Sequence, residues 1–166
     1  MEPPHDHDHD HDLDPLTFGP DQLCFGCGPQ NAVGLRMRFR REGDEVVTRF
    51  TPGLGYEGPP GILHGGLQAT LVDELAAWTV VGLRARMGFT TALEVKLHRP
   101  VRIGTEIVGR GRITHEQSRR VTIAVTLEQL GSACVAGTVT YALPAVHAAE
   151  RILGQRLPDA WKRFCR

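Results

Sequence analysis

The fold of this chain is decided by residues 61–74, GILHGGLQATLVDE. The stretch joins a glycine-rich turn around His64 to an apolar helix that carries Asp73 and Glu74. Backbone N–H groups at a helix start lack partners within the helix, so they point at whatever lies before it. A carboxylate within an apolar helix costs free energy unless it is paired, solvated at a cavity or used chemically. Donors and a carboxylate on one short segment favour acyl chemistry.

The one long helix that the sequence predicts runs from residue 65 to about 82 and is apolar on nearly every side. Such a helix is a buried one. The rest of the chain has the alternating pattern of strands, and its short connections indicate an antiparallel sheet. We expect an α+β architecture in which this sheet wraps around one long central helix. The expected elements are a hairpin at 34–40 and 45–50, a four-strand meander at 90–99, 106–114, 120–129 and 133–143, and short helices at 146–153 and 159–164.

Three parts are expected along the chain. Residues 1–22 alternate histidine and aspartate from position 5 to 12 and then contain prolines, so they predict a disordered tail and linker. Residues 23–143 form the expected folded domain. Residues 144–166 are expected to add a helical extension at the surface.

Composition indicates an ordinary globular protein. The 166 residues fit one domain, and 19 basic side chains balance 19 acidic ones. A formal net charge of zero argues against electrostatic binding to nucleic acid or to an anionic membrane. No apolar run approaches a membrane span, and the N-terminus lacks the pattern of a signal peptide. We therefore expect a cytoplasmic protein.

The four cysteines predict no metal centre. Cys24 and Cys27 form one CxxC pair, whereas Cys134 and Cys165 stand alone. A zinc site normally shows two such pairs, or one pair with spaced histidines. The favoured interpretation is therefore two reduced residues in a turn, with only weak transition-metal binding open to the histidine–aspartate tail.

Three segments together resemble one protein family. Residues 61–73, with the pattern G-x-x-H-G-G-x-x-A-T-L-V-D, closely resemble the signature of phenylacetate-type and THEM-type acyl-CoA thioesterases. Residues 90–100 are similar to the strand that follows this signature, and residues 24–35, C-F-G-C-G-P-x-N-x-x-G-L, resemble the opening of one branch. The resemblance covers about residues 24–143. It implies the hot-dog fold and hydrolysis of an acyl-CoA substrate to free acid and coenzyme A, without a cofactor.

The resemblance also implies roles for individual residues. The N–H of Gly65, directly after His64, would polarise the thioester carbonyl, and Gly66 would let the substrate approach closely. Asp73 would act as general base toward water or as nucleophile, and the residues leave both open. Thr90 would help to orient the water.

The spacing of His64 and Asp73 means either that Asp73 is not catalytic or that it meets His64 and Gly65 of a second subunit. Nine residues on one helix correspond to about 13 Å along its axis and roughly half a turn out of phase. The two residues therefore cannot meet at one carbonyl within one chain. The resembling family forms composite sites between paired subunits, so we expect a homo-oligomer, either a dimer or dimers paired into a tetramer.

Other residues are assigned more peripheral roles. Glu74 is the reserve for the acidic residue and a candidate substrate contact. Arg119 and Arg120, in a predicted turn, are candidates for the phosphates of coenzyme A. Some relatives carry an asparagine six residues before the histidine; here Gly58 occupies that position, and Glu57 precedes it.

Three other functions remain open from the sequence. The chain could bind acyl-CoA or a lipid metabolite without hydrolysing it. A hot-dog hydratase or dehydratase would place its histidine differently from the order seen here. Metal binding through the tail and the CxxC pair is the third.

Overall fold

The computed structural model describes residues 10–166. The tail predicted for residues 1–9 lies outside the described residues. The described elements are, in chain order, β1 (His11–Leu13), η1 (Pro15–Phe18), β2 (Phe39–Glu42), β3 (Glu45–Phe50), η2 (Leu54–Tyr56), α1 (Gly65–Arg84), β4 (Phe89–Leu97), β5 (Ile107–Gln117), β6 (Arg120–Gln129), β7 (Ser132–Ala142), α2 (Val146–Leu153) and α3 (Asp159–Lys162).

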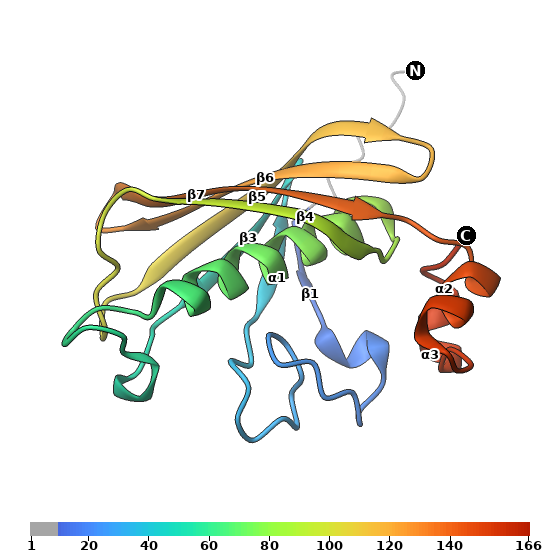
Figure 1. Ribbon diagram of the computed structural model, residues 1–166, viewed down its shortest axis with the longest axis horizontal. Coiled ribbons are helices and arrows are strands. Elements are labelled where there is room, and N and C mark those ends of the chain that lie inside the picture. Colours follow the sequence, from blue (N-terminus) through green and yellow to red (C-terminus); the bar gives the residue numbers. More distant parts are fainter. Residues whose placement is uncertain (1–9) are drawn as a thin grey trace, which may run out of the picture.

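Seven antiparallel strands form one sheet in the order β1-β2-β3-β5-β6-β7-β4. The long helix α1 lies along one face of this sheet, and α2 and α3 gather at one end of it (Figure 1). This arrangement confirms the predicted architecture of an antiparallel sheet around one central helix. The helix extends two residues beyond the predicted end, to Arg84.

The order of the later strands differs from the predicted meander. Strand β4 pairs with β7, while β5 lies between β3 and β6. The connection from β4 to β5 is too long for a hairpin and contains Pro100 and Gly104. It passes the start of α1, where the N–H of Leu63 donates to the carbonyl of Val101 at 2.8 Å. Strand β4 is thereby left at an edge of the sheet.

Residues 10–22 are part of the fold, which corrects the expectation of a disordered linker up to residue 22. Strand β1 pairs with β2, and the side chain of Leu13 packs over Gly82 of α1. Phe18 is buried against Trp78, with ring centroids 5.7 Å apart. The Trp161 indole of α3 donates to the carbonyl of Phe18 at 2.8 Å, so the two ends of the described chain support each other. The charged pattern before Leu13 masked these apolar anchors.

The first predicted strand is also shorter than expected. Residues 34–38 have the alternation of a strand, but Arg36 has a φ of 53°, which interrupts extended backbone. The strand therefore begins at Phe39. The hairpin of β2 and β3 around Gly43 agrees with the prediction.

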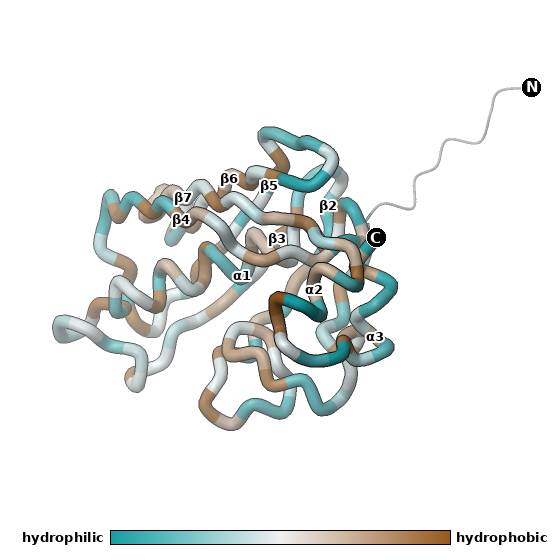
Figure 2. Tube along the Cα trace, turned by 45° about the vertical axis from the view of Figure 1, so that its right-hand side comes forward, coloured by the Kyte–Doolittle hydropathy of each residue, from teal (hydrophilic) through white to brown (hydrophobic). Residues whose placement is uncertain are grey.

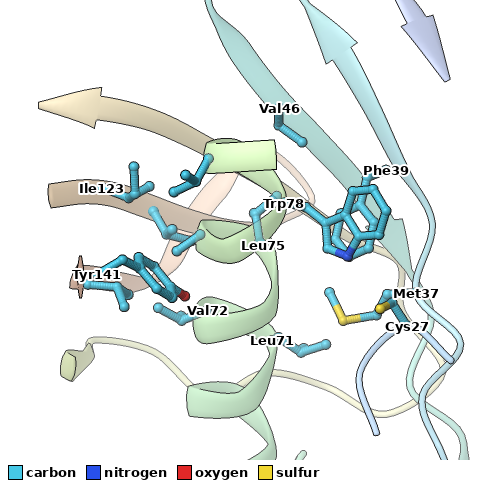
Figure 3. Packing of buried hydrophobic residues seen from close by; sticks show 14 of the residues in the cluster. Cys27, Met37, Phe39, Val46, Leu71, Val72, Leu75, Trp78, Ile123 and Tyr141 are labelled. Atoms are coloured by element: carbon cyan, nitrogen blue, oxygen red, sulfur yellow. The ribbon is translucent and has the colours of Figure 1, made fainter. Parts of the chain in front are cut away.

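The core lies between α1 and the sheet (Figure 3). Val72 and Leu75 are completely buried, and the ring of Trp78 stacks on that of Phe39 with centroids 5.0 Å apart. The sheet has a glycine on β7 where the helix approaches closely: a Cβ atom at Gly137 would lie 2.3 Å from the Cγ1 atom of Val72. The helix can therefore pack at this depth only because β7 carries no side chain there.

The apolar residues are distributed along the strands and α1 and do not form one continuous run, as the colouring in Figure 2 shows. Among residues 10–166, no helix has the length and hydropathy needed to span a membrane.

The close contact between β7 and α1 predicts a large effect of one methyl group. The variant Gly137→Ala is expected to lower the free energy of unfolding by about 1 to 3 kcal/mol, because the buried Val72 must move. Urea unfolding measures this. The control is Gly55→Ala, where a Cβ atom meets nothing within 4 Å, and which is expected to change stability by less than about 0.5 kcal/mol. Equal effects of both variants would contradict the packing argument.

Candidate active site

The turn before α1 leaves one backbone donor free. His64 caps the helix, and its Nδ1 atom accepts the N–H of Gly66 at 3.0 Å. The N–H groups of Leu67 and Gln68 both reach the His64 carbonyl at 3.0 Å. Within the described residues, no hydrogen bond is recorded for the N–H of Gly65. This N–H stands at the positive end of the helix dipole, where it can receive a developing negative charge.

A shallow groove of about 420 Å³ lies beside Gly65. Gln68 lines it, together with the end of β4 at Leu97. The Gln68 amide donates to the Leu63 carbonyl at 2.7 Å, while its buried Oε1 atom has no partner among the described residues. Among the described residues, the groove therefore combines largely apolar walls with one free backbone donor at the helix start.

Glu57 supports the same turn. Its carboxylate accepts the N–H of Gly61 at 2.7 Å, and Gly61 has a φ of +74°. A Cβ atom at Gly58 would lie 3.2 Å from the Cα atom of His64. Glu57 and Gly58 therefore shape the backbone around His64. One carboxylate oxygen of Glu57 is engaged in the hydrogen bond to Gly61.

Asp73 is held by two hydroxyl groups from the edge of the sheet. The Thr90 hydroxyl, at the start of β4, donates to the Oδ1 atom of Asp73 at 2.9 Å. The Tyr141 hydroxyl of β7 lies 2.8 Å from the same Oδ1 atom and 2.6 Å from the Asp73 carbonyl oxygen. Thr91 is directed elsewhere, to the Thr140 carbonyl. The Asp73 carboxylate is thus fixed through one oxygen.

The other oxygen of Asp73 is available. No hydrogen bond or ion pair within residues 10–166 is recorded at its Oδ2 atom, and the side chain is only half-buried. A carboxylate oriented through one oxygen and open at the other can accept a proton from water or attack an electrophile.

Tyr141 is a residue of this site that the sequence interpretation missed. It lies on the inward-facing side of β7 and is only 2% exposed. Burial and the neighbouring Asp73 carboxylate raise the pKa of Tyr141, so its hydroxyl stays a donor. The available signal was the apolar alternation of residues 133–143, which turns this tyrosine inward, where its hydroxyl needs a partner.

The structure does not bring all predicted residues together within one chain. His64 with Gly65, and Asp73, stand on one continuous helix, about 13 Å apart along its axis. Arg119 lies in the β5–β6 turn and Arg120 begins β6, level with the start of β4 but with β7 between them. Gly65 lies near Leu97, at the end of β4. One chain therefore contains the proposed parts at opposite ends of β4.

Glu74 faces away from Thr90 and Tyr141. Its Oε1 atom accepts the Trp78 indole N–H at 3.2 Å, and both of its oxygens lie 3.5 Å from the Cys24 sulfur. Burial raises the pKa of Glu74 to about 7. In Figure 3, Cys27 and Tyr141 lie on opposite sides of α1, which separates the surroundings of Glu74 from those of Asp73.

The comparison with protein families gives one match. Residues 60–136 match the family described as "Thioesterase superfamily". This range begins just before the His64 turn, contains α1 and β4, and ends within β7. The resemblance found from the sequence is confirmed over this part of the chain.

Known proteins give similar results. The chain is 30% identical over 94 residues to acyl-coenzyme A thioesterase THEM4 of Xenopus laevis, across 55% of this chain but only 42% of that protein. Among solved structures, it resembles the thioesterase superfamily protein RHA08564 with a TM-score of 0.68 and 24% identity, over 76% of this chain and 67% of that one. A hypothetical thioesterase from Streptococcus pneumoniae, solved with coenzyme A, gives a TM-score of 0.58 and 19% identity, over 60% and 81% of the two chains.

The structural likeness establishes the fold. The chain has the hot-dog fold of thioesterase-superfamily structures, as the sequence predicted. It spans less than half the length of its curated relative from Xenopus laevis.

The Tyr141 contact predicts a measurable stability difference. The variant Tyr141→Phe is expected to lower the free energy of unfolding by about 1 to 2 kcal/mol, because Asp73 loses a hydrogen bond to a buried donor. Tyr56→Phe is the matched control, since no hydrogen bond of the Tyr56 hydroxyl is recorded among the described residues. Urea unfolding of both variants checks the difference, and equal losses would show that the Tyr141 hydroxyl does not stabilise the site.

Proposed function

We propose that this protein is an acyl-CoA thioesterase that hydrolyses a thioester to a free acid and coenzyme A. The observation that carries the proposal is the Asp73 carboxylate, held through Oδ1 by Thr90 and Tyr141 and open at Oδ2. The similarity to acyl-coenzyme A thioesterase THEM4 and to a thioesterase solved with coenzyme A supports the substrate class.

The chemistry follows from the two halves of the site. The Gly65 N–H stabilises the oxyanion that forms as the carbonyl carbon is attacked. Asp73 takes a proton from the attacking water, or attacks first and forms an anhydride that water then opens. In either route the carbon–sulfur bond breaks, the thiolate of coenzyme A leaves and is protonated, and the acid is released. By holding Oδ1, Thr90 and Tyr141 direct the Oδ2 atom toward the attacking water in the first route or toward the carbonyl carbon in the second.

A pair of subunits completes the site in this proposal. Strand β4 is a sheet edge of nine residues whose side chains are mostly exposed. Leu93 and Leu97 lie on the same side of β4 as the half-buried Val95, yet they are 44% and 52% exposed. A long open edge with exposed leucines favours pairing with another strand.

Antiparallel pairing of two β4 strands about Leu93 and Glu94 brings the halves together. Thr90, which holds Asp73, would then stand opposite the partner's Leu97. Leu97 lies against Gly65, because a Cβ atom at Gly65 would be 3.4 Å from the Leu97 Cδ1 atom. A two-fold axis makes two equivalent sites, each with Asp73 from one subunit and Gly65 from the other.

The same pairing supports the assignment of the arginines. Arg119 and Arg120 lie at the Thr90 end of the sheet, so a two-fold partner would bring its Gly65 end toward them. We propose that they bind the phosphates of coenzyme A. Gly66, exposed on the first turn of α1, would line the approach to the carbonyl, and a cytoplasmic location is part of the proposal.

The Gly65 N–H can be removed without breaking the helix. Gly65 is the first helical residue, where proline is favoured, and His64 has φ −54° and ψ 133°, which suit a residue before proline. Gly65→Pro is expected to lower kcat for release of free thiol from acyl-CoA esters by about 100-fold or more. Gly65→Ala keeps the N–H and is the matched control. Asp73→Asn is expected to cause a loss at least as large.

Three outcomes would contradict the proposal. If no acyl-CoA ester in a panel of short, long and aromatic acyl groups releases thiol, the protein is not this enzyme. Unchanged acyl-CoA binding in Asp73→Asn, with no turnover in the wild type, would favour the non-catalytic binding function. Turnover that Asp73→Asn leaves unaltered would place the chemistry elsewhere.

A complementation experiment tests the composite site. Asp73→Asn and Gly65→Pro chains, each inactive alone, form mixed dimers with one intact site when they are coexpressed. Random pairing is expected to restore about a quarter of the wild-type activity, since half of the dimers are mixed and each has one good site. A site contained within one chain predicts no recovery. Thiol release by the coexpressed pair, measured beside each single variant, decides between the two.

A further inference from the structure

The segment between η1 and β2 is long and irregular. Residues 19–38 contain no helix or strand, and loops of this length without regular structure are uncommon in compact domains. Its turn at Cys24–Cys27 is tightly folded, with the Gly28 N–H donating to the Cys24 carbonyl at 2.8 Å. A Cβ atom at Gly28 would lie 2.6 Å from that carbonyl oxygen, so only glycine fits there.

This turn places both thiols against the carboxylate of Glu74. Cys24, Cys27 and Glu74 each offer one ligand atom, and these atoms lie within 4.8 Å of one another. Both cysteines are free thiols. The Cys24 sulfur is 3.5 Å from each Glu74 oxygen. In a tetrahedral zinc site with Zn–S of about 2.3 Å and Zn–O of about 2.0 Å, sulfur and oxygen ligands lie about 3.5 Å apart.

Neighbouring groups orient these three side chains. The Trp78 indole donates to Glu74, and the Gln22 side chain accepts the Cys24 N–H at 2.9 Å. Hydrogen bonds of this sort, made to the ligand residues by their neighbours, fix ligand orientation in metal sites.

The cluster also lacks a positive charge. No salt bridge to Glu74 is recorded in the described part of the chain, although the carboxylate is enclosed by the turn and α1. A Cβ atom at Gly26 would lie 2.4 Å from the Glu74 carboxyl carbon, so the turn closes directly over it. A cation would offset the cost of keeping this partly buried carboxylate charged beside two thiols.

We propose that Cys24, Cys27 and Glu74 bind a zinc-class divalent cation that fastens residues 19–38 to α1. The two thiols lose their protons to solvent on binding, and water completes the tetrahedral coordination. A groove lined by Gln22, Leu23 and Cys24 reaches the cluster from solvent and gives the cation an entry path. The sequence pattern of a single CxxC pair concealed this site, because the third ligand lies 50 residues after Cys24.

The proposal is independent of the thioesterase function and is tested with metal alone. Co²⁺ added to the reduced, metal-free full-length protein is expected to give a thiolate-to-cobalt charge-transfer band and the visible bands of tetrahedral cobalt, at one equivalent. The histidine–aspartate tail contains no cysteine, so it cannot produce the thiolate charge-transfer band. Zn²⁺ is expected to displace the cobalt and to raise the thermal midpoint of unfolding.

Variants locate the ligands. Cys24→Ser and Cys27→Ser are expected to abolish the charge-transfer band, whereas Cys134→Ser, a buried cysteine elsewhere, keeps it. Glu74→Gln retains both thiols and a similar shape, and it is expected to weaken Co²⁺ binding tenfold or more, with the visible bands altered. Circular dichroism establishes that each variant is folded.

Three results would overturn the proposal. The first is the absence of a charge-transfer band in the reduced wild type. The second is a charge-transfer band that survives in folded Cys24→Ser, or an affinity for Co²⁺ that Glu74→Gln leaves unchanged. The third is a Cys24–Cys27 disulfide in protein alkylated directly in the cells, because oxidised sulfur cannot ligate the cation.

Discussion

The packing of α1 against the sheet is the constraint on which the rest of this structure depends. The helix approaches β7 so closely that Val72 leaves no room for a side chain at Gly137. This depth brings the Tyr141 hydroxyl within hydrogen-bond distance of both the side chain and the carbonyl of Asp73. A helix set farther out would leave the Tyr141 hydroxyl buried without a partner and Asp73 free to turn. The orientation of the Asp73 carboxylate therefore depends on how closely α1 packs against the sheet.

The two adjacent carboxylates of α1 meet different environments because neighbouring positions on a helix point about 100° apart. Asp73 faces hydroxyl donors at the sheet edge, where it remains half-open to solvent. Glu74 faces sulfur and an indole beneath the N-terminal segment. The same stretch of chain thus serves a candidate reaction site on one side and a candidate structural site on the other.

The sequence predicted the features that depend on local pattern. The all-round apolar helix from Gly65 and the alternating strands gave the correct architecture. The contact of Thr90 with Asp73 was not predicted, because the sequence assigned Thr90 only to orienting water. The local sequence pattern could not predict which distant strands pair with each other. Strand β4 joined β7 because a long connection carried the chain across the sheet, and Tyr141 met Asp73 through that same non-local packing. Leu13 and Phe18 were misjudged because charged neighbours hid two anchors that only the folded helix reveals.

The two edges of the sheet are unlike each other, and this limits how the molecule can assemble. One edge ends in β1, a strand of three residues that carries His11 and Asp12 and continues into a charged segment. Short, charged edges resist further strand addition. The other edge, β4, is three times as long and exposes leucines. If two copies pair through β4 as proposed, both ends of the joined sheet are β1 strands, which leaves no long edge for further strand addition and so no route to a fibre.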